Sequence, residues 1–486
     1  MNVLKDLRPK KVFEYFEMLS SVPHGSGNTK QISDLCVRFA KDHGLDWYQD
    51  ELNNVIIYKP ASKGYEGKEP VILQGHLDMV CVKTEDNTAD LSKEAIKLMT
   101  DGEWVWADRT SLGGDNAIAV AMSLAVLDDD SLAHPPIEAV FTTDEETGMY
   151  GAEGLDVSKI RGRRMMNIDS EEEGIFTAGC AGGQRANISL KVKRDEMNEK
   201  CLSLNSFAEI CVDGLIGGHS GMEIDKERGN ANIIMARLLY DISKRVGIRI
   251  CEIEGGKFDN AITRKNVAKI AIPKAAYKAF SDEVKRYATL LKKEYETSDP
   301  GLSIYVIGCR PSQAPVTRED TVKMLSLVIA MPYGVQNMSM DIKGLVETSL
   351  NLGVMKLEGD TFTFGYALRS SVQSRKEALA EKLKIIANSF GAAAAFRGAY
   401  PCWTFSKNSP LRDTLMKAYK TVYGGEGVIS ATHGGLECGL FIEKMPGLDC
   451  VSFGPDLRDV HSVREKLNVA SVERTYALIC ETLKNL

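Results

Sequence analysis

The chain has 486 residues, of which 44% are hydrophobic and 26% are charged, and its formal net charge is −7. This length exceeds what one ordinary hydrophobic core can bury, so we expect a soluble globular protein of two domains. The acidic balance argues against broad binding to nucleic-acid phosphates, which needs clustered basic residues, but it leaves room for a local basic pocket.

The first third of the chain alternates between segments typical of helices and segments typical of strands. Such alternation predicts an α/β sheet covered by helices. The expected elements are a helix over 12–22, strands over 54–60 and 70–75, a buried helix over 116–129, and strands over 137–144 and 163–170.

The character of the sequence changes at about residue 184. Strand-like alternation in 185–195 and 207–215 is followed by helical spacing in 230–246 and 275–296, and a similar succession runs through 320–398. The last segment returns to the earlier style, with a helix over 411–424, a strand over 448–455 and a final helix from about 469. We therefore predict one domain formed by 1–184 and 401–486, interrupted by an inserted α+β domain over 185–400.

Neither a signal peptide nor a membrane span is predicted. Charged residues interrupt the N-terminal segment, and the longest apolar-rich run, 117–127, is shorter than the roughly 20 residues that a span needs. The 11 cysteines are odd in number and contain no C-x-x-C pair, which is typical of reduced thiols. We expect a cytoplasmic protein.

A histidine and an aspartate end the apolar strand that begins at Val71. His76 and Asp78 are two residues apart, so they face the same side and leave the sheet at the carboxyl end of the strand, where α/β sheets bind ligands. A metal-bound imidazole commonly has a carboxylate partner. The pair fits a metal site and a solvated polar strand end equally well.

Acidic residues stand at two further boundaries between elements. Asp115 follows two glycines just before a helix, where an aspartate can also act as a helix cap. Glu145 and Glu146 end the strand over 137–144, and adjacent glutamates repel each other unless a cation lies between them or they face apart. A solvated acidic turn is the alternative.

Two more candidates complete the set. Asp169 closes the strand over 163–170, and His461 stands in a loop before the last helix. Two imidazoles with several carboxylates suit zinc, or manganese or cobalt at oxygen-rich positions. A shared carboxylate would make a two-metal site with ions roughly 3.5–4 Å apart, and one glutamate would remain as a proton carrier.

In this order, the motifs resemble those of the di-zinc aminopeptidase and carboxypeptidase superfamily, which includes aminoacylases, tripeptidases and carnosinases. The segments that carry the resemblance are GHLDMV, GGDNAIA, TTDEETG, NIDSEEEG and DVHSVRE. Four others resemble the bacterial aminoacyl-histidine dipeptidases, also called cytosolic non-specific dipeptidases: GCAGGQR, GGHSGMEI, GGKFDNAITR and THGGLECG. The resemblance covers essentially the whole chain.

The resemblance implies a role for each candidate in a catalytic domain of the di-zinc aminopeptidase type. His76 and Asp169 would hold one zinc, Glu146 and His461 the other, and Asp115 would bridge them. Asp78 would orient His76, and Glu145 would be the general base for attack by a zinc-bridging hydroxide.

The inserted domain would be a lid that contacts the substrate and forms a homodimer. His219 resembles the lid histidine that reaches a neighbouring active site and steadies the oxyanion, and Arg369 resembles the lid arginine that binds the substrate carboxylate. Asn260 would hydrogen-bond the substrate, and His433 would line the pocket. The alternatives are a glycine-turn histidine for His219, a surface arginine for Arg369 and a structural turn for Asn260.

The implied activity is metal-dependent hydrolysis of dipeptides, including Xaa-His dipeptides such as carnosine, with two divalent cations as cofactors. A deacylase of N-acyl amino acids or a tripeptidase on the same scaffold is the alternative. A catalytically silent metal-binding protein is a third possibility, against which the retained Glu145 argues.

Overall fold

The computed structural model describes residues 3–486, which fold into two compact units. Unit 1 contains the chain up to Cys180 together with Phe405–Ala431 and Leu436–Leu486. Unit 2 contains Ala181–Thr404 and the short return Thr432–Gly435, which the sequence did not suggest. Within residues 3–486, no helix is both long and apolar enough to cross a membrane.

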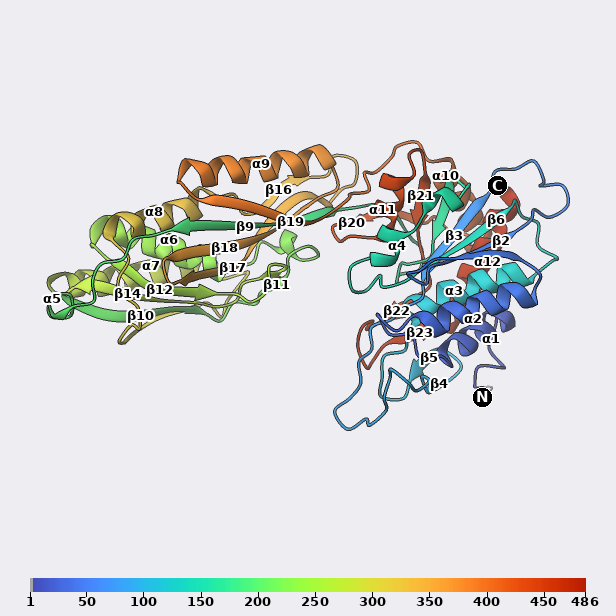
Figure 1. Cartoon of the computed structure of the whole chain (residues 1–486), viewed down its shortest axis with the longest axis horizontal. Helices are drawn as coiled ribbons and strands as arrows, with labels where there is room; N and C mark the ends of the chain where they lie inside the picture. Colours follow the sequence, from blue (N-terminus) through green and yellow to red (C-terminus); the bar gives the residue numbers. More distant parts are fainter. Residues whose placement is uncertain (1–2) are drawn as a thin grey trace. The chain divides into compact units, whose positions relative to one another are not determined.

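Unit 1 is built on a mixed eight-stranded sheet (Figure 1). In spatial order its strands are β1 (Asp46–Gln49), β2 (Val55–Lys59), β6 (Ile137–Thr142), β3 (Val71–His76), β7 (Arg164–Asn167), β21 (Asp449–Ser452), β8 (Ile175–Cys180) and β20 (Val428–Thr432). β3 pairs in parallel with both β6 and β7, so the carboxyl ends of these three strands meet at one edge of the sheet.

The helices of unit 1 are α1 (Lys10–Ser20), α2 (Lys30–Asp42), α3 (Gly114–Asp128), α4 (Tyr150–Gly154), η1 (Val157–Lys159), α10 (Pro410–Tyr423), α11 (Glu437–Lys444) and α12 (Val469–Asn485). α3 packs on β3 and is buried from Asn116 to Leu127, because its residues are apolar on every side. A small sheet completes the unit, with strands β22 (Leu457–Arg458), β23 (Lys466–Asn468), β5 (Trp104–Ala107) and β4 (Leu98–Thr100).

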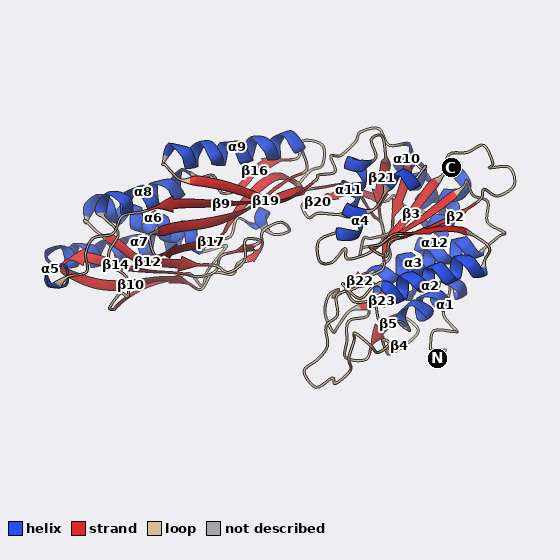
Figure 2. Cartoon of the chain, in the orientation of Figure 1, coloured by secondary structure: helices blue, strands red, loops and turns tan. Residues whose placement is uncertain are grey.

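Unit 2 has a nine-stranded antiparallel sheet with helices packed on it (Figure 2). Its strands are β15 (Ser303–Gly308), β10 (Asn205–Asp213), β14 (Asn266–Pro273), β12 (Arg249–Gly255), β17 (Val346–Glu358), β18 (Thr361–Ser370), β9 (Gly182–Lys191) and β19 (Ala393–Tyr400), with β16 (Gly334–Met338) paired to β17. The other elements are α5 (Glu199–Leu204), α6 (Ala231–Arg245), α7 (Tyr277–Glu294), α8 (Arg318–Ala330), α9 (Gln373–Ser389), η2 (Ile224–Lys226), η3 (Lys274–Ala276), β11 (Gly218–His219) and β13 (Ala261–Ile262).

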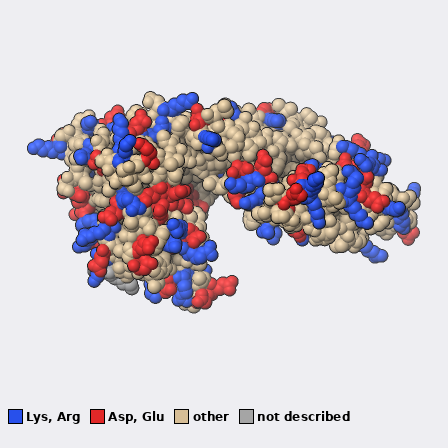
Figure 3. Space-filling model, turned by 180° about the vertical axis from the view of Figure 1, so that it is seen from behind, with Lys and Arg blue, Asp and Glu red and all other residues tan. Residues whose placement is uncertain are grey.

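This architecture agrees with the predicted class, a mixed sheet flanked by helices and interrupted by an α+β unit. On the face that Figure 3 shows, Lys and Arg side chains are interspersed with Asp and Glu.

Candidate metal centre

The five predicted ligands all lie in unit 1, at the edge where the parallel strands end. His76 is the last residue of β3, Glu146 follows β6, and Asp169 follows β7. Asp115 stands in the first turn of α3, and His461 lies in the loop between β22 and β23. The topology of the sheet therefore collects side chains that are far apart in the sequence.

Four short distances join these five side chains into one cluster. His76 Nε2 lies 3.1 Å from Asp115 Oδ1 and 3.5 Å from Asp169 Oδ1. His461 Nε2 lies 3.2 Å from Asp115 Oδ2 and 2.9 Å from Glu146 Oε1. The two oxygens of Asp115 thus face two different imidazoles.

Asp115 is not the cap of α3. Asp115 has non-helical backbone angles, φ −83° and ψ 100°, at a kink near the start of α3. Its two carboxylate oxygens bond to His76 and His461, and among residues 3–486 neither accepts a backbone N–H of α3. The helix-cap interpretation of this residue is therefore wrong. The departure from helical geometry turns the carboxylate away from the helix N–H groups and toward the two histidines.

The ionisable side chains of the cluster shift one another's pKa values. Burial opposes protonation of His76, but hydrogen bonds to Asp115 and Asp169 outweigh it and hold the pKa of His76 well above its usual value. Hydrogen bonds to Asp115 and Glu146 raise the pKa of His461 to about 10. Burial raises the pKa of the Asp169 carboxyl to about 6. Negative charge is thus crowded into a space with little water, which favours cations.

The donor set fits a divalent metal. Ligand atoms of His76, Asp115 and Glu146 all lie within 4.8 Å of one another. Neighbouring ligands of a tetrahedral zinc with bonds of ~2.0 Å are about 3.3 Å apart, close to the separations found here. His76 is 1% exposed whereas the side chain of His461 is 46% exposed, so the cluster opens to solvent on the His461 side.

The Asp78 carboxylate lies near His76 and also makes contacts that the sequence did not suggest. His76 Nδ1 is closer to the main-chain carbonyl oxygen of Asp78, at 2.9 Å, than to its carboxylate, at 3.5 Å. The carboxylate also accepts hydrogen bonds from the backbone N–H groups of Glu145 and Glu146, at 3.0 and 3.3 Å, and from the Ser26 hydroxyl at 2.8 Å. Asp78 therefore ties the end of β3 to the segment that carries both glutamates.

Glu145 lies at the cluster without an ion pair to either histidine among the described residues. Burial raises the pKa of its carboxyl well above the usual value, and the charges of Asp169 and Glu437 add to this effect while His76 opposes it. The raised pKa makes the carboxylate a stronger proton acceptor, which suits a group that takes up and returns a proton.

A carboxylate that the sequence analysis did not single out, Glu465, holds the loop before α3. Its two oxygens accept backbone N–H groups of Leu112 at 2.8 Å, Gly113 at 3.2 Å and Gly114 at 2.8 Å. Glu465 thereby fixes the approach to Asp115. Two features of the sequence could have indicated this contact. Glu465 is an acidic residue four positions after His461, and the glycine pair before Asp115 has successive N–H groups that can bind an anion.

A second missed carboxylate, Glu437, lies buried beneath the strand ends. Its Oε2 accepts hydrogen bonds from Gln74 Nε2 and from the Thr142 hydroxyl, both at 2.7 Å. Asn167 Nδ2 in turn donates to Gln74 Oε1. These polar side chains link β6, β3 and β7 just below the candidate ligands. Polar residues inside otherwise apolar strands were the signal that could have found this network.

Two residues expected to contact substrate, His219 and Arg369, lie together in unit 2. A Cβ on Gly221 would lie 3.1 Å from both His219 Cε1 and Arg369 Cζ, so glycine leaves room for the two side chains to meet. His219 Nδ1 accepts the Met222 N–H at 3.1 Å, which leaves the proton on Nε2. Arg369 Nη1 donates to the Tyr400 hydroxyl at 3.1 Å, and its Nε is buried without a partner within residues 3–486. Donors of this kind can bind a carboxylate.

His433 and Asn260 belong to the same region of unit 2. His433 Nε2 lies 2.7 Å from the Ser349 hydroxyl, and Ser349 pairs in register with Arg369 across β17 and β18. Burial and the charge of Arg369 lower the pKa of His433 to about 3, so the ring is neutral. The carbonyl of Asn260 accepts the N–H of the residue that follows His219, at 2.9 Å.

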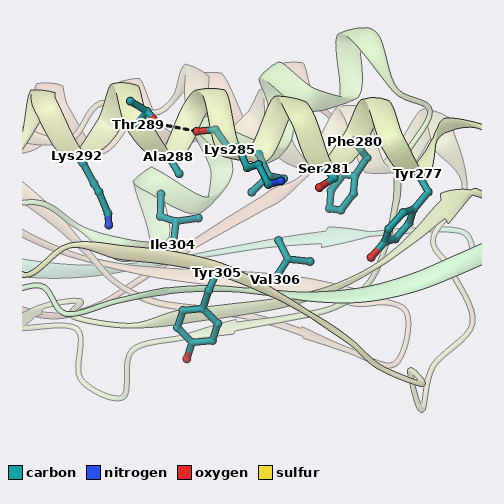
Figure 4. A pocket seen from close by; sticks show the side chains of 11 residues that line it. Tyr277, Phe280, Ser281, Lys285, Ala288, Thr289, Lys292, Ile304, Tyr305 and Val306 are labelled. Atoms are coloured by element: carbon teal, nitrogen blue, oxygen red, sulfur yellow. Dashed lines mark hydrogen bonds between the residues drawn. The ribbon is translucent and has the colours of Figure 1, made fainter.

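A cavity of about 450 Å³ between α7 and β15 in unit 2 is not a candidate for this chemistry (Figure 4). Its lining includes Tyr277, Lys285, Lys292 and Tyr305, but no histidine, cysteine or carboxylate side chain. It therefore offers no ligand set for a metal.

The chain is similar to known peptidases. The chain matches the model of peptidase family M20/M25/M40 over residues 72–485. The cytosol non-specific dipeptidase of Escherichia coli (strain K12) is 35% identical, over 100% of this chain and 99% of that protein. The crystal structure of aminoacylhistidine dipeptidase from Vibrio alginolyticus has 34% identity and a TM-score of 0.93, over 99% and 98% of the two chains. Aminopeptidase PepT from Bacillus cereus ATCC 10987, 16% identical with a TM-score of 0.55 over 98% of both chains, shares the fold.

Proposed function

Because the chain belongs to peptidase family M20/M25/M40, whose members are hydrolases acting on peptide bonds, we propose that it is a metal-dependent dipeptidase with two divalent cations in unit 1. The two relatives with 35% and 34% identity are both named as dipeptidases. The observation that carries the proposal is Asp115, whose two carboxylate oxygens each lie within 3.2 Å of a different imidazole. A carboxylate so placed can give one ligand atom to each of two cations.

In the proposed site, His76 and Asp169 would hold one cation, Glu146 and His461 would hold the other, and Asp115 would contribute to both. We propose zinc, because imidazole and carboxylate are its usual ligands, with cobalt or manganese as substitutes at the oxygen-rich positions. When bound, the cations would lower the pKa of a water molecule and would polarise the peptide carbonyl.

The side chains of the protein then move the proton and hold the substrate. Glu145 takes the proton of the attacking water and delivers it to the departing amine. Asp78 keeps the backbone of Glu145 in place through its N–H hydrogen bond. His219 donates to the carbonyl oxygen as negative charge develops on it. Arg369 binds the C-terminal carboxylate of the dipeptide, with Asn260 and His433 completing the contacts.

A substrate panel tests the proposed activity. We expect the purified protein to hydrolyse ordinary dipeptides and Xaa-His dipeptides such as carnosine, measured by release of free amino acids. N-acyl amino acids and tripeptides should be cleaved much more slowly, because the former lack the free amine and the latter hold their two free ends one residue further apart than a dipeptide does. If N-acyl amino acids are the preferred substrates, the protein is a deacylase. If tripeptides are preferred, it is a tripeptidase. Full metal content without any hydrolysis would identify a silent metal-binding protein.

We propose further that unit 2, corresponding to the predicted segment 185–400, is a lid through which two chains form a homodimer, and that His219 serves the active site of the partner subunit. If so, mixing Glu145→Gln and His219→Ala homodimers under exchange conditions should restore activity, because each mixed dimer regains one complete site. Random exchange predicts recovery to about a quarter of the wild-type rate. Each variant mixed with itself is the control, and no recovery despite proven exchange would place His219 in its own chain's site.

A cytoplasmic location completes the proposal. Within residues 3–486 the cysteines form no disulfide, as expected of a reducing compartment, and the E. coli relative is named as a cytosol enzyme.

A further inference from the structure

An unpaired strand forms one outer edge of the unit 2 sheet. β15 ends the strand order and pairs with β10 alone, so within residues 3–486 no strand pairs with its outer side. Its sequence, SIYVIG, contains neither a charged residue nor a proline, and Tyr305 and Ile307 are 42% and 50% exposed. Proteins usually protect an edge with charges, prolines or bulges, as β19 does at the opposite edge with the exposed Arg397 beside a register shift. β15 is therefore open to pairing with a further strand.

The cavity of about 450 Å³ lies between this edge strand and α7. Ile304 and Val306 point from β15 toward the helix, whereas Tyr305 points to the other face of the sheet (Figure 4). On the helix the lining includes Ser281 and Ala288, whose small side chains leave space. An extended peptide that pairs with β15 would lie in this groove, with every second side chain directed toward α7.

The charged side chains that line the groove are positive and lack partners. Lys285 and Lys292 are seven residues apart on α7, so they lie on the same side of the helix, two turns apart. Glu283 and Glu294 of the same helix bind arginines outside the groove. Neither lysine forms an ion pair among residues 3–486, and the lining contains no carboxylate. A carboxylate that enters the groove would therefore meet two ammonium groups without a competing partner.

We propose that the groove between α7 and β15 binds an extended acidic segment of another protein, which adds a strand to the edge of the sheet. The backbone of the segment bonds to the outer N–H and C=O groups of β15. Its acidic side chains, at every second position, reach Lys285 and Lys292, and the apolar side chains between them cover Tyr305 and Ile307 on the other face. A second copy of this chain fits less well, because two joined β15 edges would bring two lysine-lined grooves together without carboxylates.

Fluorescence anisotropy with the full-length, metal-loaded protein tests the proposal. The probe is fluorescein-labelled Glu-Val-Glu-Val-Glu-Val with a C-terminal amide, whose blocked ends distinguish it from a dipeptide substrate. We expect it to bind, and we expect Lys285→Glu combined with Lys292→Glu to raise its Kd roughly tenfold or more. Lys278→Glu combined with Lys293→Glu reverses two exposed charges of the same helix outside the groove. This matched control should change the Kd by less than about threefold, because solvent and salt screen these charges.

Further peptides and one further variant identify the mode of binding. In an added strand, alternate N–H groups face β15, so one of the two possible patterns of alternate N-methylation should abolish binding. The peptide Lys-Val-Lys-Val-Lys-Val, labelled in the same way, should not bind, because its ammonium groups would meet those of the groove. Ala288→Trp, which fills the groove without changing its charge, should also raise the Kd of the acidic peptide roughly tenfold or more.

Four results would overturn the proposal. They are no binding of the acidic peptide to the wild-type protein, undiminished binding of both N-methylated peptides, equal binding of the lysine peptide, and equal effects of the groove and control charge reversals. A change in the molar mass of the Lys285→Glu, Lys292→Glu variant, measured by light scattering, would also overturn it and would make the groove an interface between copies of this chain. An unchanged circular-dichroism spectrum shows that a variant is folded, and Ala288→Trp provides the test if the charge-reversed variant is not.

Discussion

Glu145→Gln should lose most turnover while both cations stay bound. The substitution removes the group that accepts and returns a proton, and such groups contribute roughly 10²–10⁴-fold to the rate. It leaves the five proposed ligands unchanged, because Glu145 makes none of the four short contacts that join them. Steady-state kinetics on a dipeptide and metal analysis of the same preparation measure both parts.

Glu172→Gln is a suitable control for Glu145→Gln. Glu172 is an exposed glutamate in the loop after β7, and it should keep the wild-type rate because it faces solvent. A near wild-type kcat for Glu145→Gln would remove Glu145 from the role of general base. Loss of metal in that variant would instead make it part of the ligand set.

Removal of the metals should abolish activity and lower thermal stability together. Without cations, Asp115, Glu146 and Asp169 crowd negative charge into a partly buried site. A ligand present at 1,000 times its Kd stabilises the folded state by about 4.1 kcal/mol, so Tm should rise when the cation is restored. Dialysis against a chelator, followed by stepwise addition of one cation, gives activity and Tm on the same samples.

The identity of the added cation is the control in that experiment. Zinc, cobalt or manganese should restore both quantities, whereas magnesium should not, because it prefers octahedral oxygen ligands and keeps its waters. Undiminished hydrolysis by protein shown to be metal-free would contradict the proposed chemistry.

Most of the fold could be predicted from the pattern of apolar residues. The buried strand β3 and the buried helix α3 form near their predicted limits because each is a long apolar run between turn residues. The order of strands in the sheets could not be predicted, since it depends on pairings between distant segments. The placement of residues 432–435 in unit 2 could not be predicted for the same reason. It includes a hydrogen bond between His433 and Ser349, which are 84 residues apart in the sequence.

The convergence of the five candidate ligands could be predicted because each stands at the end of a strand or the start of a helix. Their contacts could not. The sequence suggested that the Asp78 carboxylate orients His76, but it gave no sign that the same carboxylate also holds the backbone of Glu145 and Glu146. The roles of Glu437 and Glu465 could not be predicted. The sequence shows each as a single acidic residue, and it does not show that the carboxylate is buried among N–H and amide donors.

The proposed chemistry requires two cations, both of which Asp115 would bind. Anomalous diffraction from crystals of the reconstituted enzyme, collected at the absorption edge of the metal that restores activity, tests this most directly. We predict two peaks per chain, roughly 3.5–4 Å apart, one beside His76 and Asp169 and the other beside Glu146 and His461. A single peak, or peaks away from Asp115, would contradict it.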